Sequence, residues 1–134
     1  MLKDIEIEPV KDVGVAVVKE KNAEGEDIFN VYLINNKSED ITGVLVSSKG
    51  YGEIEGEKRS SSALRHFLDT VEGPGYKIIE PIVEEVFNLT NEYWVSFFHD
   101  NKMLDKKFLF VPGSVDESNF VTVPVLGKKG IIIL

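Results

Sequence analysis

The sequence contains no cysteine, and its 134 residues include only two histidines and one tryptophan. The absence of cysteine excludes disulfides, thiolate zinc ligands and cysteine nucleophiles, and it slightly favours a reducing compartment. The two histidines, His66 and His99, form neither an H-x-x-x-H nor an E-x-x-H pattern, so a zinc or iron site would need carboxylates for its remaining ligands. The sequence therefore predicts neither a metal centre nor a cofactor.

Long hydrophobic runs are also missing. No apolar stretch approaches the ~20 residues of a membrane-spanning helix. The first residues, Met1 to Glu6, contain no apolar core of the kind found in a signal peptide. The sequence thus predicts a cytoplasmic protein with no membrane partner.

Basic residues are outnumbered, with 15 lysines and arginines against 23 acidic residues and a net charge of −8. Such a surface repels phosphate backbones, and the basic pairs are too short to form a stripe, so nucleic acid is not an expected partner. The 43% hydrophobic content is typical of a globular protein, and the length fits a single domain spanning residues 1–134.

Two apolar runs in the stretch from Glu92 to Pro112 predict a β-hairpin around the polar segment 99–102. The stretch holds the single tryptophan, Trp94, and half of the eight phenylalanines. In an extended chain Trp94 and Phe98 point to one face, and Tyr93 and Phe97 point to the other. Because both faces carry apolar side chains, we expect this hairpin to be central and covered on both sides.

Strand patterns begin near residues 13, 28, 41, 62, 76, 92 and 104, with turn residues between them. Short strands at such spacing favour an all-β fold, an antiparallel β-sandwich (immunoglobulin-like) of about seven strands. Residues 120–126 and the terminal run 131–134 add a C-terminal hairpin, with Pro124 restricting its strand to an edge. A terminal isoleucine run exposed on an edge predicts homodimerisation through that strand.

Two segments fit a helix as well as a strand. Residues 60–71 begin with three serines and then place Leu64, Phe67, Leu68 and Val71 at helical spacing, but they also alternate as a strand. Residues 81–87 could form a short helix that starts at Pro81, or residues 76–83 could form an edge strand containing it. The alternative to the sandwich is therefore an α+β fold with short helices near 62–71 and 81–87.

Catalytic patterns are scarce, because no serine lies in G-x-S-x-G and the glycines of residues 50–56 match no nucleotide-binding loop. The sequence therefore predicts a non-enzymatic interaction or structural module. The alternative is a protein that binds a small ligand or a peptide in a pocket of Tyr, Arg and His side chains. Its candidate ligand-binding residues are Ser48, Lys49, Tyr51, Arg65, His66 and Trp94.

Four strings, residues 30–35, 43–52, 64–68 and 91–97, together resemble a family of small uncharacterised acidic proteins of Bacteroidetes-type bacteria. The resemblance covers most of the chain from about Val13 onward. Some members of that family carry the label phenylalanyl-tRNA synthetase α subunit. Class II synthetases have a far larger catalytic domain with arginine-bearing ATP motifs, and Arg59 and Arg65 are the only arginines here. The resemblance therefore implies no catalytic activity, and at most a role near translation.

Overall fold

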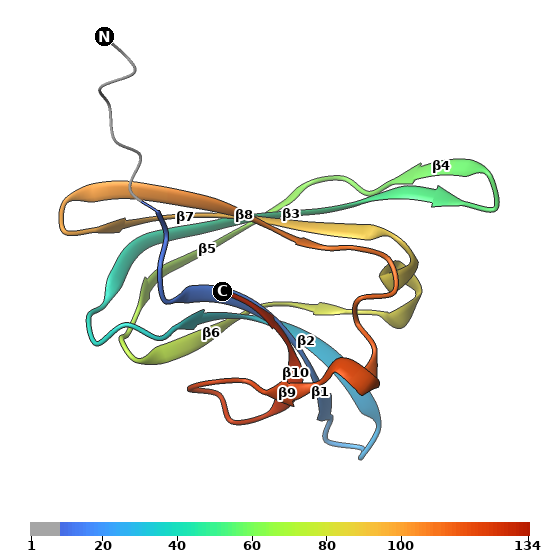
Figure 1. Ribbon diagram of the computed structural model, residues 1–134, viewed down its shortest axis with the longest axis horizontal. Coiled ribbons are helices and arrows are strands. Elements are labelled where there is room, and N and C mark those ends of the chain that lie inside the picture. The colour runs from blue at the N-terminus through green and yellow to red at the C-terminus, as the bar shows by residue number, and fades with distance from the viewer. Residues whose placement is uncertain (1–8) are drawn as a thin grey trace, which may run out of the picture.

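Alternating apolar side chains fold the chain into two antiparallel β-sheets that pack face to face (Figure 1). The computed structural model describes residues 9–134. The first eight residues, where the sequence predicts no signal peptide, lie outside the described residues. No helix within residues 9–134 is both long and apolar enough to cross a membrane.

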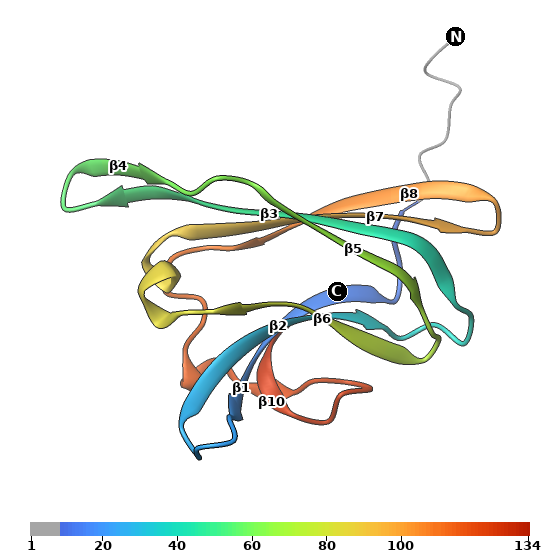
Figure 2. The same ribbon diagram turned by 180° about the vertical axis from the view of Figure 1, so that it is seen from behind.

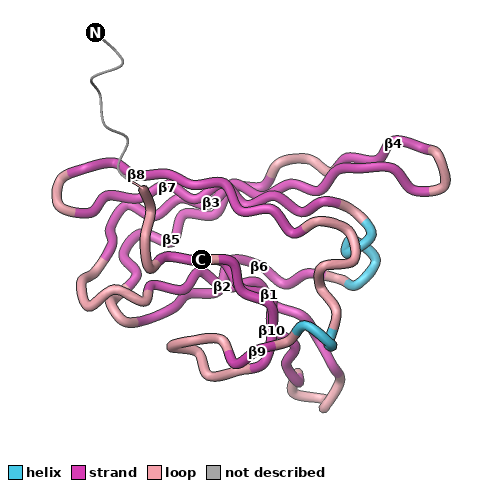
Figure 3. Tube along the Cα trace, in the orientation of Figure 1, coloured by secondary structure: helices cyan, strands magenta, loops and turns pink. Residues whose placement is uncertain are grey.

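The two sheets are formed by strands from all parts of the chain. Sheet A has the spatial order β6 (Gly75–Ile82), β2 (Asp27–Asn35), β1 (Val13–Lys21), β10 (Lys129–Ile133) and β9 (Val121–Thr122). In sheet B the order is β8 (Lys102–Phe110), β7 (Thr90–His99) and β3 (Ile41–Ile54), and the far edge of β3 pairs with β5 (Leu64–Val71) and β4 (Glu57–Ser60). Two short 3-10 helices, η2 (Glu84–Asn88) and η3 (Glu117–Asn119), lie in the connections between strands (Figure 3).

The predicted sandwich is confirmed, with strands at all seven of the expected positions and a C-terminal pair, β9 and β10. One strand was not expected. β4 pairs with the end of β3, and this hairpin extends beyond the rest of sheet B (Figure 1). The helix considered for residues 62–71 is wrong, because β5 pairs with β3 there. Figure 2 shows β5 leading from sheet B to the turn that enters β6.

The second ambiguous segment contains both structures that the sequence allows, one after the other. β6 is the edge strand of sheet A and contains Pro81, as the strand interpretation predicts. The short helix η2 follows β6 at Glu84 and does not begin at Pro81. An edge strand tolerates proline because one side of its backbone needs no ladder hydrogen bonds.

The main core lies between the sheets and consists of the inward-facing residues of both. Its largest fully buried members include Tyr93, Phe97 and Phe108 from the predicted hairpin and Leu33 from β2. On β7, Tyr93 and Phe97 are an even number of residues apart, as is Val95 between them, which places all three on one face of the pleated sheet.

The outer face of sheet A is covered by the C-terminal segment. Ala16, Val18 and Ile34 point away from the main core and pack with Val123 in a second buried cluster. Within this segment the predicted strand 120–126 is mostly wrong, since only Val121 and Thr122 form a strand. Pro124 instead lies in the turn that leads to β10.

The outer face of sheet B has no such cover within residues 9–134, which corrects the expectation for the Glu92–Pro112 hairpin. The hairpin itself forms, as β7 and β8, but β8 is an edge strand. Trp94, Phe98 and Met103 lie on the outward face and are 46%, 47% and 65% exposed. Apolar residues on both faces of a strand thus did not mean burial of both faces.

Close contact between β10 and β1 depends on Gly130. A Cβ atom at this position would lie 2.2 Å from the carbonyl oxygen of Val17, so Gly130→Ala forces the two strands apart. We expect this substitution to lower the free energy of unfolding by about 2–3 kcal/mol, measured by urea denaturation. Gly56→Ala is the control, because Gly56 has a φ of 79° with no atom within 4 Å of its added Cβ. It adds only backbone strain of about 1–2 kcal/mol, and an equal loss in both variants would contradict the steric argument.

Candidate functional site

The six candidate residues from the sequence do not form one pocket. Successive side chains of a strand point to opposite faces. Ser48 and His66 therefore point between the sheets, where both contact Glu80. The other four candidates belong to the outer face of sheet B, and they are Lys49, Tyr51, Arg65 and Trp94. The structure thus divides the predicted site into two separate candidates.

We define the outer face of sheet B by its six exposed apolar side chains. Strand register brings them into neighbouring positions, for example Leu45 opposite Phe67 and Phe98 opposite Met103. Phe67 is 68% exposed. The full set is Leu45, Phe67, Trp94, Phe98, Met103 and Leu109.

One end of this face is organised around Glu92, which is mostly buried although it points outward. Its carboxylate lies 3.7 Å from the Lys49 amine and 3.8 Å from the Lys107 amine. The Tyr51 hydroxyl also donates a hydrogen bond to it, at 3.4 Å. One carboxylate therefore contacts three side chains of the outer face.

Trp94 lies beside this cluster. The Lys107 amine sits 4.9 Å from the centre of the Trp94 ring, which is within the range of a cation–π contact. The indole N–H donates to Asp105 at 3.4 Å. Arg65 pairs with Ser47, which in turn pairs with Trp94, so Arg65 and Trp94 flank the same residue of β3. Within residues 9–134 no carboxylate lies within salt-bridge distance of the Arg65 guanidinium, unlike the two lysines.

The second candidate is centred on Glu80 of β6. Its Oε1 atom lies 2.7 Å from His66 Nε2 and accepts a hydrogen bond from Ser48 Oγ at 2.7 Å. Its Oε2 atom accepts from the Tyr93 hydroxyl at 3.0 Å. Glu80, a residue of sheet A, is thus bound by three side chains of sheet B.

Glu80, Ser48 and Tyr93, but not His66, line a cleft of about 400 Å3 between the sheets, at the end of the sandwich where η2 lies. Its polar groups come from these three residues and from Ser61, Ser62 and Asn91. Its other walls are apolar and include Leu64, Ile82, Val86 and Leu89. Apolar walls with a few convergent polar groups are typical of small-molecule sites.

The proton arrangement in this cleft does not favour nucleophilic catalysis. Burial raises the pKa of the Tyr93 hydroxyl far above its ordinary value, and the Glu80 carboxylate raises it further, so Tyr93 remains a proton donor. The Ser48 hydroxyl donates to Glu80 rather than to His66. A serine nucleophile needs a base that accepts its proton and is itself positioned by a third group, and that order of contacts is not present here.

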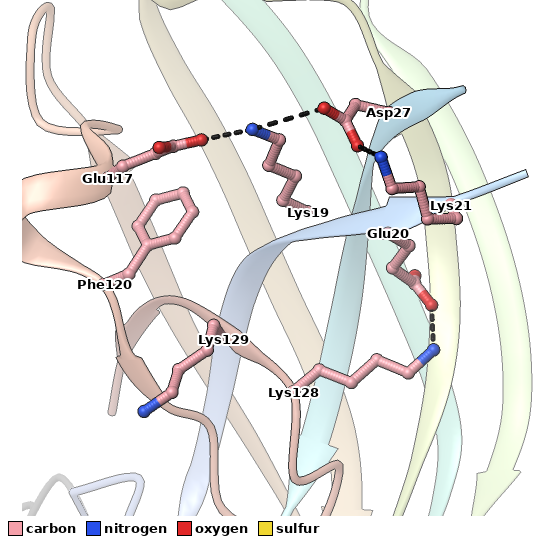
Figure 4. A pocket seen from close by; sticks show the side chains of 8 residues that line it. All are labelled: Lys19, Glu20, Lys21, Asp27, Glu117, Phe120, Lys128 and Lys129. Atoms are coloured by element: carbon pink, nitrogen blue, oxygen red, sulfur yellow. Dashed lines mark hydrogen bonds and ion pairs between the residues drawn. The ribbon is translucent and has the colours of Figure 1, made fainter. Parts of the chain in front are cut away.

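A third concave region, of about 680 Å3, is rich in lysine (Figure 4). Each of its lysines is engaged. The Lys19 amine lies between Glu117 and Asp27, and the Lys21 amine also pairs with Asp27. The hydrogen bond from Lys19 to Glu117 raises the pKa of the lysine. Since Glu117 belongs to η3, these pairs attach the C-terminal segment to β1 and β2.

Glu20 makes a second attachment of the same kind. It accepts hydrogen bonds from Asn30 at 3.0 Å and from the Tyr32 hydroxyl at 2.5 Å, and it forms an ion pair with Lys128. Burial by itself would raise the pKa of the Glu20 carboxyl, but these donors, Lys128 foremost, outweigh burial and lower it. We interpret the lysine-rich region as an ion-pair network that holds the C-terminal segment on sheet A.

Glu39, His99 and Asp100 offer ligand atoms within 4.8 Å of one another. They lie near the turn between β7 and β8, at the end of the sandwich opposite η2. Glu39 lies 3.6 Å from Nε2 of His99, and Asp100 lies 3.8 Å from Nδ1. Both separations are longer than a hydrogen bond. Nε2 is also buried, and it has no hydrogen-bond partner within the described residues. The His99 ring is therefore in contact with both carboxylates but hydrogen-bonded to neither.

Sequence reasoning missed Glu92, the carboxylate at the outer face of sheet B, and Glu80, the carboxylate of the cleft. One signal was available for Glu92, because an acidic residue lies inside a strongly apolar strand. Glu80 gives no comparable signal, since its partners come from three other strands. No protein-family model matches the chain, and no curated protein is similar to it in sequence.

The lowered pKa of Glu20 predicts a pH-dependent contribution to stability. A carboxyl whose pKa is lower in the folded state stabilises the protein above its ordinary pKa, and the contribution is lost as pH falls through the folded-state pKa. We expect Glu20→Gln to reduce the free energy of unfolding by about 1–2 kcal/mol at neutral pH. This difference from the wild type should shrink towards zero as the pH falls below the ordinary carboxyl pKa and through the lower folded-state pKa.

Urea denaturation at several pH values measures this effect. Glu24→Gln is the matched control, because Glu24 is an exposed glutamate in the turn after β1. It should leave the free energy of unfolding nearly unchanged at every pH. A Glu20→Gln effect that stays constant down to acidic pH would contradict the assignment of the stabilisation to the ionised carboxylate.

Proposed function

We propose that this protein is a non-enzymatic, cytoplasmic interaction module that binds another protein through the outer face of sheet B. The observation that carries the proposal is the contrast between the two sheets. The chain covers the outer face of sheet A with its own C-terminal segment, yet leaves six large apolar side chains exposed on sheet B. A contiguous exposed apolar patch on a protein of this size is typical of an interaction surface.

The composition of this face supports a protein partner. Trp, Tyr and Arg are the residues most enriched at the energetic centres of protein interfaces, and this face contains Trp94, Tyr51 and Arg65. Lys107 contacts both Glu92 and the Trp94 ring, so it links these two residues of the face before any partner binds.

Arg65 specifies the chemistry of the partner further. The other cations beside Trp94 are already paired with Glu92, whereas Arg65 lacks an acidic partner within residues 9–134. A guanidinium recognises a carboxylate with two parallel hydrogen bonds. The partner that fits is therefore a protein surface with apolar side chains around a carboxylate. The role near translation implied by the family resemblance stays a prediction.

Substitutions at this face test the proposal. We expect Phe67→Ser and Arg65→Glu each to weaken binding of the partner by roughly 30-fold, the effect of losing an interface residue worth about 2 kcal/mol. Both side chains are exposed on the edge strand β5, so the fold is retained. The partner is first isolated by cross-linking to the wild-type protein in a native extract, and its affinity for each variant is then measured by calorimetry.

Two control variants match these changes away from the face. Val83→Ser removes an exposed apolar side chain after β6, and Lys11→Glu makes the same charge reversal before β1. Both should bind the partner like the wild type. If the partner binds the Phe67→Ser and Arg65→Glu variants as tightly as the wild type, the outer face of sheet B is not the interaction surface.

A second copy of the chain is the other candidate partner, through the C-terminal strand. β10 pairs with β1 along Gly130–Ile133, but on its other side β9 pairs only with Lys129 and Gly130. Within residues 9–134 the outer edge of Ile131–Ile133 therefore has no strand partner, which is the observation that favours pairing between copies. We expect a dimer mass by light scattering at micromolar concentration, and a monomer mass would rule this contact out.

A further inference from the structure

The cleft around Glu80 faces away from the proposed interaction surface and has a chemistry of its own. Its lining includes one carboxylate, that of Glu80, whose side chain is only 17% exposed, and several apolar side chains. The Lys49 backbone also lines the cleft, but its amine lies on the other side of sheet B with Glu92. Among the residues that line the cleft, Glu80 therefore supplies its only ionised group.

The hydrogen bonds to Glu80 leave room for one more donor. A carboxylate has about four acceptor positions, two on each oxygen. His66 and Ser48 occupy two positions on Oε1, and Tyr93 occupies one on Oε2. The remaining position is on Oε2, the oxygen bound by only one donor. Since the three present donors fix the carboxylate, a ligand that binds it does not have to order it first.

We propose that this cleft binds a small organic cation, a primary ammonium group attached to an apolar body. The ammonium donates a hydrogen bond to the open position on Glu80 Oε2. The apolar body lies against Ile82, Val86 and Leu89, the apolar side chains of β6 and of the η2 region. The volume of about 400 Å3 lies within the usual range for small ligands, ~300–1,000 Å3.

Other classes of ligand fit this cleft less well. An anion would be repelled by Glu80, the only ionised group in the lining. A neutral apolar molecule would exclude water from the carboxylate and leave its fourth acceptor position unpaired, which is unfavourable for a partly buried charge. The net charge of −8 also raises the local concentration of cations at the surface.

The test uses the full chain and the probe 2-phenylethylammonium, with neutral 2-phenylethanol as its isosteric counterpart. We expect the ammonium to cause saturable chemical-shift changes in backbone amides around Ser48, Glu80 and Leu89 in two-dimensional NMR spectra. The alcohol should bind at least about tenfold more weakly, because it cannot form a charge-assisted hydrogen bond. Equal affinities for the two probes, or shifts that lie elsewhere in the protein, would overturn the proposal.

Glu80→Gln removes the charge and keeps an acceptor oxygen for only one of the two hydroxyls, because Ser48 and Tyr93 donate to different oxygens of Glu80. It should weaken binding of the ammonium at least about tenfold. Glu85→Gln is the matched control, because it removes the same charge from an exposed position of η2 beside the cleft. If both variants lose the same affinity for the ammonium, the effect comes from the overall charge of the protein, and a specific site at Glu80 is refuted.

A further variant leaves Glu80 intact. Val86→Trp fills the apolar part of the cleft, so it should abolish binding while the spectrum of the folded protein is retained. Undiminished binding by Val86→Trp would place the ligand outside the cleft.

Discussion

Strand β3 is the element on which the rest of the structure depends. It pairs with β7 along one edge and with β5 and β4 along the other, so sheet B is assembled on both sides of it. Because a strand turns alternate side chains to opposite faces, Ser48 enters the space between the sheets while Lys49 reaches the outer face. One short run of β3 thus contributes to two candidate sites that share no side chain.

A carboxylate organises each of these two sites. Glu92 holds Lys49, Lys107 and Tyr51 in place on the outer face of sheet B, and Glu80 joins His66, Ser48 and Tyr93 between the sheets. In both places three side chains that carry donors contact one carboxylate that is largely removed from solvent. The difference lies in the surroundings. Exposed apolar side chains adjoin Glu92, whereas Glu80 lines a cleft.

The outer face of sheet A is covered and that of sheet B is exposed, and this difference supports a functional rather than a folding role for the exposed apolar residues. The C-terminal segment buries Val18 and Ile34 against Val123 on sheet A, and the ion pairs of Lys19 and Glu20 hold that segment in place. No comparable segment within residues 9–134 covers Trp94 or Phe98. Residues that the fold does not bury, and that are large and apolar, are available to a partner.

The strand positions followed from the sequence because alternation and turn residues are local signals. The same local signals could not decide between helix and strand for residues 64–71, since Leu64, Phe67 and Leu68 suit both periods. Pairing with β3, more than 15 residues earlier in the chain, resolved the choice. Local signals also misled on the β7–β8 hairpin, because they show that a face is apolar but not whether another element covers it.

The sequence by itself determined an acidic, cysteine-free β-sandwich, because composition and period-two patterning act residue by residue. Only the tertiary structure decided which apolar face stays exposed and which carboxylate meets which donors. Both depend on strand order and on how the two sheets face each other. This arrangement brings Glu80 into contact with Ser48, His66 and Tyr93, which lie too far away in the chain for a local sequence pattern to indicate the contact.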